Sequence, residues 1–287
     1  MYCTFYGFRE SPFTITPNPR FLFMSVQHRE AFAHLIYAVE NRAGFIELTG
    51  EVGTGKTTLL RTFLSRLDSE GHRTALIFNP CLSSLELLAS INKEFGLPWE
   101  SGSRAELLQV LNSFLLEQKA AGRSVVLVMD EAQNLAPEVL EQIRLISNLE
   151  TETDKLIQIV LAGQPELLAV LAREELRQLN QRITVRYHLL PMEYESMCRY
   201  IDHRMELAGR FRAAEFTKGA LKRIYRFSGG VPRLVNIACD RALLVGYTEE
   251  DRLISGRMAA QAIQEIRGRG PLATARGVFG RLLGFWR

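Results

Sequence analysis

The spacing of apolar residues changes near residue 190 and divides the chain into two parts. Before this point, short apolar runs alternate with amphipathic segments of helical length. The runs predict strands over 45–49, 74–78, 125–129, 156–162 and 183–189. The run 125–129 is apolar at every position, which is typical of a strand buried on both faces. Strands that alternate with helices predict a parallel sheet with helices on both faces.

The helices of the first part have recognisable ends. Ser83 with Glu86, and Ser103 with Glu106, fit the capping box, in which a hydroxyl and a carboxylate satisfy two orphan backbone donors. Pro137 suits the first turn of a helix. The predicted helices cover 26–41, 56–67 and 137–149, two segments that follow the capping serines, and two short segments that end near 182.

After Pro191 the spacing is helical throughout. It predicts helices over 193–208, 217–228, 232–246 and 255–266. We therefore expect an α/β domain over 1–190, a small all-helical domain over 191–267 and a separate tail over 268–287.

Composition and charge narrow the class of protein. The 287 residues are 47% hydrophobic and 23% charged, which is ordinary for a globular chain. Five of the 35 basic residues follow Glu265 and none of the 32 acidic residues does, so residues 1–266 carry a net charge of −2. A globally basic nucleic-acid binder is not indicated, and nucleic acid is the less favoured partner.

Several features are expected to be absent. The N-terminus lacks a basic start followed by an apolar run, so we expect no signal peptide. No apolar run is long enough to span a membrane. The four cysteines form no CxxC pair and the five histidines show no metal-ligand spacing, so we expect reduced thiols and no metal cage. The expected location is the cytoplasm.

The segment 50–57 matches the phosphate-loop pattern G-x-x-x-x-G-K-[ST]. Glycines allow backbone N–H groups to turn inward around phosphate, and the helix that begins there adds the positive end of its dipole. Lys56 is expected to reach the β- and γ-phosphates, and the Thr57 hydroxyl to bind Mg²⁺. The predicted ligands are ATP and Mg²⁺, and the predicted cofactor-binding residues in this segment are Gly50, Gly53, Thr54, Gly55, Lys56, Thr57 and Thr58.

The predicted strand 125–129 leads directly into Asp130 and Glu131. Ligands of parallel α/β sheets bind at the carboxyl ends of the strands. Asp130 is therefore expected to hold Mg²⁺, and Glu131 to orient and deprotonate an attacking water.

Hydrolysis also needs stabilisation of charge at the γ-phosphate, and the sequence offers three kinds of candidate. Gln164 follows the fourth predicted strand, although it also fits a turn before Pro165. Arg182 directly precedes the last strand, where it would reach the nucleotide of a neighbouring subunit. The pattern leaves open whether this arginine is Arg182, Arg177 or Arg186, or an ordinary surface residue. Arg233 opens a helix of the second part and is a candidate to fold over the γ-phosphate.

The order of these motifs resembles that of AAA+ ATPases and, more narrowly, of the ExeA/GspA type with its shorter MshM-like members. The resemblance covers about residues 1–267. It rests on the segments Phe5–Phe8, Pro12-Phe13, Thr16–Pro19, Thr49–Thr57, Asp130–Leu135, Leu149–Thr151, Gly163–Leu167, Leu176–Leu179, Gln181–Ile183 and Gly230–Arg233.

The resemblance implies a P-loop NTPase with a three-layer αβα nucleotide-binding domain over 1–190 and a helical lid domain over 191–267. It implies cytoplasmic ATPases that serve type II secretion, type IV pili or exopolysaccharide export, with an inner-membrane partner. It also implies a homo-oligomer with an arginine finger supplied in trans, and it would bring Phe13 onto the adenine. The longer members continue into a membrane span and a peptidoglycan-binding region. This sequence stops before either region, so direct peptidoglycan binding is not expected here. AAA+ proteins usually have Asn, Ser or Thr where this chain has Gln164.

The tail 268–287 alternates arginines with apolar residues. On a helix, Phe279, Leu282, Leu283 and Trp286 would share one face, which suits a membrane surface, and thus a peripheral place at the inner membrane, or a groove in a partner. Its four glycines equally fit a disordered segment.

Two other functions compete with an envelope ATPase. One is a DNA-associated AAA+ ATPase, such as a transposition target selector or an initiator-like loader, with an arginine stripe of Arg204, Arg210 and Arg212. The other is a scaffold that binds nucleotide without hydrolysing it, which the intact Lys56 and Glu131 disfavour.

Overall fold

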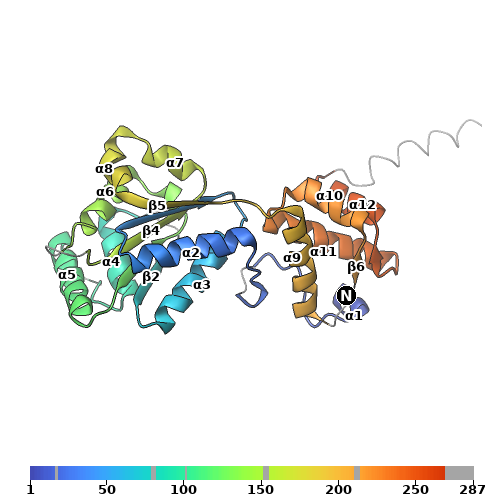
Figure 1. The fold of residues 1–287 in the computed structure, drawn as a ribbon, viewed down its shortest axis with the longest axis horizontal. Helices are drawn as coiled ribbons and strands as arrows, with labels where there is room; N and C mark the ends of the chain where they lie inside the picture. Colours follow the sequence, from blue (N-terminus) through green and yellow to red (C-terminus); the bar gives the residue numbers. More distant parts are fainter. Residues whose placement is uncertain (17–18, 79–81, 101, 151–154, 210–213, 269–287) are drawn as a thin grey trace, which may run out of the picture. The chain divides into compact units, whose positions relative to one another are not determined.

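The computed structural model describes residues 1–16, 19–78, 82–100, 102–150, 155–209 and 214–268. The chain divides into two compact units. One unit, here called the sheet unit, is Val26–Leu190. The other, the helical unit, combines Met1–Ser25 with the residues from Pro191 onward (Figure 1).

The sheet unit is built on one parallel sheet, which has five strands within the described residues, in the order β2-β3-β4-β1-β5. Because every pairing is parallel, all carboxyl ends of the strands lie at the same edge. The strands are β1 (Phe45–Gly50), β2 (Arg73–Ile77), β3 (Val125–Met129), β4 (Gln158–Gly163) and β5 (Ile183–Leu189).

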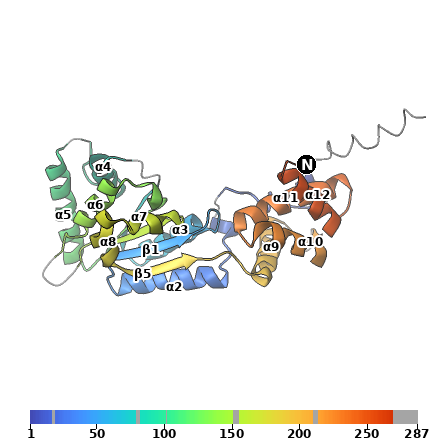
Figure 2. The ribbon, with the colours of Figure 1, turned by 90° about the horizontal axis from the view of Figure 1, so that it is seen from above.

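Helices cover both faces of this sheet. On one face, α2 packs on β1 and β5, and α3 packs on β1 and β2 (Figure 2). On the other face, Leu127 and Met129 of β3 join a continuous apolar core with residues of α4 to α8. The helices are α2 (Val26–Glu40), α3 (Lys56–Ser69), α4 (Ser84–Glu94), α5 (Arg104–Ala120), α6 (Pro137–Ile146), α7 (Glu166–Leu171) and α8 (Arg177–Arg182).

This architecture confirms the predicted three-layer α/β fold with a parallel sheet and following helices. All five residues of β3 are buried, as their uniform apolar character predicts. Both capping boxes form, at Ser83 with Glu86 and at Ser103 with Glu106. The predicted strand 183–189 has the observed bounds of β5.

The helical unit packs four longer helices around one apolar core within the described residues. These are α9 (Tyr194–Ala208), α10 (Lys218–Ser228), α11 (Pro232–Thr248) and α12 (Gly256–Ile266). A short helix, α1 (Tyr2–Tyr6), and a parallel pair of two-residue strands, β6 (Glu215–Phe216) and β7 (Leu253–Ile254), were not predicted. Elements this short leave no hydrophobic periodicity in the sequence.

The first 25 residues belong to the helical unit, whereas the sequence analysis assigned them to the α/β domain. Four aromatic side chains explain the difference, because Tyr6, Phe8, Phe13 and Phe21 are buried in the core formed by α9 to α12. Hydrophobic patterning shows that such residues must be buried, but it does not show against which element.

Arg204 on α9 holds the same N-terminal segment. Its guanidinium donates to the carbonyls of Pro12 (2.6 Å) and Thr14 (3.2 Å) and to the hydroxyl of Tyr200 (2.9 Å). It also lies 4.6 Å from the centre of the Phe21 ring. The interpretation of Arg204 as part of a surface stripe was therefore wrong, and Arg210 and Arg212 lie outside the described residues.

Two further expectations concern membranes. Nearly all of the tail 268–287 lies outside the described residues. Among the residues that the structure does describe, no helix has the length and apolar character required to cross a bilayer.

Candidate nucleotide site

The loop between β1 and α3 needs glycine at two points for steric reasons. A Cβ on Gly50 would lie 2.7 Å from the carbonyl oxygen of Leu189 in β5. Gly55 has a φ of +102°, and a Cβ there would lie 2.9 Å from the His28 ring. Gly53 also has a positive φ, of 83°. The backbone therefore folds tightly between two neighbouring elements, as a phosphate cradle requires.

Polar contacts fix the same loop. The Thr54 hydroxyl donates to the carbonyl of Glu51 at 2.8 Å. His28 on α2 is buried, and its Nε2 lies 3.0 Å from the Thr54 carbonyl, to which it donates. Burial lowers the pKa of His28, which favours the neutral ring. Thr58, in the first turn of α3, is half-buried.

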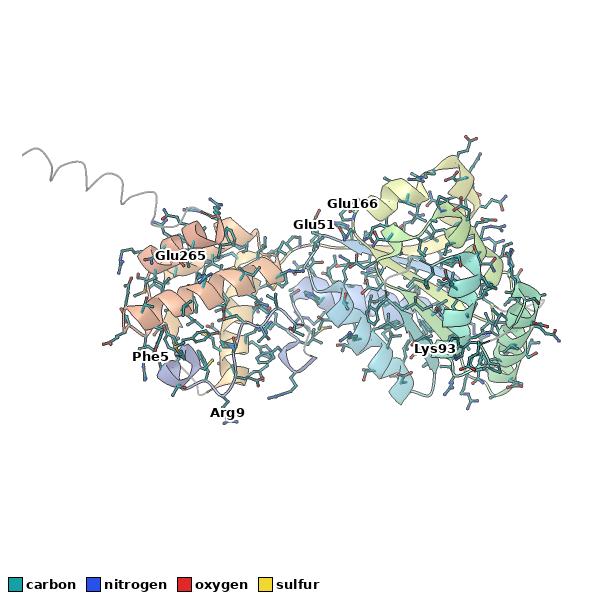
Figure 3. All side chains as sticks on the ribbon, turned by 180° about the vertical axis from the view of Figure 1, so that it is seen from behind. Phe5, Arg9, Glu51, Lys93, Glu166 and Glu265 are labelled. Carbon is teal, nitrogen blue, oxygen red and sulfur yellow. The ribbon has the colours of Figure 1, made fainter. Side chains whose placement is uncertain are left out.

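Lys56 begins α3, and its side chain lies under the loop. Its ammonium donates to the carbonyls of Gly50 (2.6 Å) and Glu51 (3.1 Å), and the residue is only 6% exposed. Burial lowers the pKa of Lys56, while the carboxylates of Glu131 and Asp130 act in the opposite direction. Glu51 and Glu166 lie at the same carboxyl edge of the sheet, and their carboxylates also raise the pKa of Lys56 (Figure 3).

Thr57, in the first turn of α3, contacts Asp130, which directly follows β3. The Thr57 hydroxyl donates to Oδ2 of Asp130 at 2.7 Å, and the Glu131 amide donates to Oδ1 at 3.0 Å. Burial raises the pKa of Asp130, whereas its hydrogen bonds lower it. A buried carboxylate beside a hydroxyl offers the hard oxygen donors that suit Mg²⁺. The described residues contain no group of three or more His, Cys, Asp or Glu side chains that would form an all-protein metal cage.

Glu131 follows Asp130 in an unusual backbone conformation. Its φ of 56° and ψ of 36° lie in the left-handed region, which residues other than glycine rarely adopt. Such strain concentrates at functional sites. Its Oε2 accepts hydrogen bonds from the side-chain amides of Gln133 (2.7 Å) and Gln164 (3.1 Å). Gln164, directly after β4, therefore contacts the residue expected to act as the base.

The three candidate arginines before and within β5 differ in their surroundings. Arg186 donates to the buried carboxylate of Glu47 at 3.0 Å and to Asn180, so its guanidinium is held within its own chain. Arg177 is exposed. Arg182 donates to the side chains of Ser147 and Asn148 and lines a cleft of about 650 Å³.

The position of Arg182 along the sheet is informative. It precedes β5, and Ile183 pairs with Phe45, the first residue of β1. Arg182 thus lies at the amino edge of the sheet, while Lys56, Asp130 and Gln164 lie at the carboxyl edge. A strand of this length spans roughly 20 Å, beyond the reach of an arginine side chain.

The remaining two predicted site residues belong to the helical unit. Arg233 is exposed in the first turn of α11. The glycine three residues before it is sterically required, because a Cβ on Gly230 would lie 1.9 Å from the carbonyl oxygen of Met192. Phe13 is 2% exposed and contacts Phe216 edge-on, so its ring is packed as a core residue.

The sequence analysis missed two residues that contact the site, His28 and Gln133. His28 lies on α2, which ends well before the phosphate loop begins. No spacing in the sequence links His28 to that loop. Gln133 lies two residues after Glu131, within the quoted segment Asp130–Leu135. A polar side chain so close to a predicted base was the available signal.

Solved structures with the same fold support the architecture. The Aeropyrum pernix ORC2 protein in ADPNP-ADP complexes matches 90% of this chain and 72% of its own, with a TM-score of 0.66 and 17% identity. The Thermotoga maritima RuvB Holliday junction branch migration motor matches 83% of this chain and 68% of its own, with a TM-score of 0.55 and 18% identity. At these identities the likeness concerns the fold alone.

Sequence comparison adds the family. The chain is 46% identical to general secretion pathway protein A of Aeromonas hydrophila over 274 residues, which cover 94% of this chain and 50% of that protein. The chain thus spans half the length of this curated relative. Residues 39–171, which include β1, α3, β3 and β4, match the family described as AAA domain. The chain is therefore an AAA domain protein.

Proposed function

We propose that the chain is a Mg²⁺-dependent ATP phosphohydrolase that powers or switches the assembly of a bacterial envelope machine, such as type II secretion, a type IV pilus or exopolysaccharide export. One observation carries the activity. The hydrogen bond between Thr57 and Asp130 joins the phosphate loop to the end of β3, directly beside Glu131. Similarity to general secretion pathway protein A supports the envelope role.

The loop residues bind and orient the nucleotide in this proposal. Backbone N–H groups of 50–55 and the N-terminus of α3 would hold the β- and γ-phosphates. Lys56 would exchange its bonds to Gly50 and Glu51 for phosphate oxygens, and burial makes each such bond stronger than it would be in water. Mg²⁺ held by Thr57 and Asp130 would neutralise developing phosphate charge.

Glu131 would accept the proton of the attacking water. The Gln164 side chain, already in contact with the Glu131 carboxylate, would orient that water or the γ-phosphate. Arg233 would add positive charge from the helical unit and would couple that unit to the nucleotide.

Arg182 would act in trans. Its place at the amino edge of the sheet keeps it from the phosphate loop of its own chain, so a homo-oligomer would bring it to the nucleotide of a neighbour. An inner-membrane secretion or pilus protein would then respond to the assembly. The tail 268–287 is our candidate for contact with the membrane surface.

The decisive experiment is a mixing assay of steady-state ATP hydrolysis. We expect the specific activity of the wild type to rise with protein concentration. When assayed alone, Arg182→Ala and Glu131→Gln should each have a specific activity about 100-fold or more below that of the wild type. An equal mixture should recover activity, because a composite site can combine Glu131 of one subunit with Arg182 of the other.

Arg173→Ala is the matched control, since Arg173 is exposed shortly before the same short helix and was not a candidate for the trans role. It should retain wild-type activity. A rate that is independent of concentration, with no recovery in the mixture, would exclude the shared site. Stimulation by inner-membrane vesicles supports the envelope role, whereas salt-dependent stimulation by duplex DNA would replace it with a DNA-associated one.

A further inference from the structure

The side-chain amide of Gln133 bridges two strand ends in the sheet unit. Its Nε2 donates to Oε2 of Glu131 at 2.7 Å, after β3. Its Oε1 accepts the backbone N–H of Gln164 at 3.1 Å, after β4. One amide thereby joins the predicted base to the segment that carries the predicted γ-phosphate residue.

The residue before Gln164 makes room for this bridge. A Cβ on Gly163 would lie 2.7 Å from Oε1 of Gln133, closer than real contacts allow. The φ of Gly163 is not positive, so its backbone conformation does not require glycine. A side chain at this position would have to displace the end of the Gln133 side chain and would press on the Leu167 side chain.

The bridge also determines which carboxylate oxygen is engaged. The amides of Gln133 and Gln164 both bond Oε2 of Glu131, and neither bond involves Oε1. Two donors on one oxygen fix the rotation of the carboxylate and direct the other oxygen away from the amides. A general base must present one oxygen at hydrogen-bond distance from its water, so this rotation matters for the rate.

We propose that Gln133 is a positioning residue for ATP hydrolysis, which holds the Glu131 carboxylate and the Gln164 backbone in register so that Glu131 presents Oε1 to water. This inference rests on the proposed function and deepens it. The hydrogen bonds of the Gln133 side chain are with Glu131 and Gln164, neither of which belongs to the phosphate loop, so its role is separable from nucleotide binding.

Two substitutions of Gln133 test the two ends of the bridge. Gln133→Ala removes both hydrogen bonds, whereas Gln133→Glu keeps an acceptor for the Gln164 amide and loses the donor to Glu131. We expect kcat to fall about 10- to 100-fold in both, because the orientation of the base is lost. The Kd of a fluorescent ATP analogue should stay within about twofold of wild type. Gln109→Ala, at an exposed position on α5, is the matched control and should change neither quantity.

Hydrogen exchange of the Gln164 backbone amide tests the geometry without any nucleotide. Exchange should become roughly tenfold faster in Gln133→Ala and remain close to wild type in Gln133→Glu, since only the latter retains the acceptor. A purely structural loss would instead accelerate exchange throughout β4.

A double-mutant cycle with Gly163→Ala completes the test. Gly163→Ala alone should reduce kcat, because its new methyl displaces the Gln133 amide. In the Gln133→Ala background the same substitution should cost much less, since there is no amide left to displace. The inference is overturned if the losses of kcat in the two single variants add up in the double variant. It is also overturned if Gln133→Ala keeps a wild-type kcat while Glu131→Gln is inactive. Either result leaves the proposed function intact. If the wild type hydrolyses no more ATP than Lys56→Ala, the proposed function itself fails, while the exchange measurement still reports on the bridge.

Discussion

Lys56 in the sheet unit and Arg204 in the helical unit are both 6% exposed, but they are buried in different ways. Lys56 donates to two carbonyls of a single loop, and the carboxylates of Asp130 and Glu131 lie near it. Arg204 donates to two carbonyls of a distant segment and to the Tyr200 hydroxyl on its own helix, and its guanidinium lies over the Phe21 ring. The first cation lies at the edge of a sheet, and the second joins two segments of a core.

The difference separates a binding role from a structural one. The contacts of Lys56 are within six residues of it along the chain, so they add little to the connectivity of the fold. The contacts of Arg204 to Pro12 and Thr14 span about 190 residues of sequence. Burial alone therefore does not distinguish a ligand-binding cation from a structural one, whereas the origin of its partners does.

Substitution of Lys56 should give the largest effect on activity. Lys56→Ala removes the charge expected at the β- and γ-phosphates, so we expect ATP binding to be lost and hydrolysis to fall by about 1,000-fold or more. The free energy of unfolding should change by less than about 1 kcal/mol, because the lost hydrogen bonds are offset by removal of a desolvated charge. Calorimetric titration with ATP and denaturant unfolding measure the two quantities.

Lys93→Ala is the control for this prediction, because Lys93 is an exposed lysine of the same unit (Figure 3). It should bind ATP as the wild type does. If Lys56→Ala instead unfolded the protein while Lys93→Ala did not, Lys56 would be a structural cation like Arg204 and the comparison would fail.

Substitution of Arg204 should have the opposite result. Arg204→Ala leaves the carbonyls of Pro12 and Thr14 without their donor and opens space beside Phe21, so we expect a loss of about 3–5 kcal/mol in unfolding free energy. Limited proteolysis should then cleave within the first 25 residues. Arg199→Ala, at an exposed position of the same helix, should cost less than about 0.5 kcal/mol.

An Arg204→Ala protein that resists proteolysis and unfolds like the wild type would show that the N-terminal segment is held by its aromatic residues alone. The apolar core around Tyr6, Phe8 and Phe13 would then be sufficient, and Arg204 would be dispensable despite its contacts.

The two units also differ in how far the sequence predicts them. In the sheet unit, the strands and the contact between Thr57 and Asp130 follow from local patterns, because parallel strands bring their carboxyl ends to one edge. In the helical unit, the location of the first 25 residues depends on contacts between distant segments, which leave no periodic trace. The same limit applies within the site, where His28 contacts the Thr54 carbonyl and Gln133 contacts the Gln164 amide across separations in sequence that no spacing predicts.

His28 sharpens the comparison, because it is a buried polar residue of the sheet unit whose contact is structural. Burial lowers its pKa in the folded protein below its ordinary value of about 6.5. The unfolded chain therefore takes up a proton more readily than the folded one, so the contribution of His28 to stability is complete above about pH 6.5 and is lost as the pH falls below it. Between pH 7 and pH 5.5, the wild type should lose more unfolding free energy than His28→Gln, within the limit of about 1.4 kcal/mol per pH unit for one proton. His34→Gln, at an exposed position of the same helix, should lose as much as the wild type.

Denaturant unfolding at the two pH values measures this difference. An equal loss in wild type and His28→Gln would show that protonation of His28 does not strain the phosphate loop, and that the loop is held by its glycines and Thr54 alone.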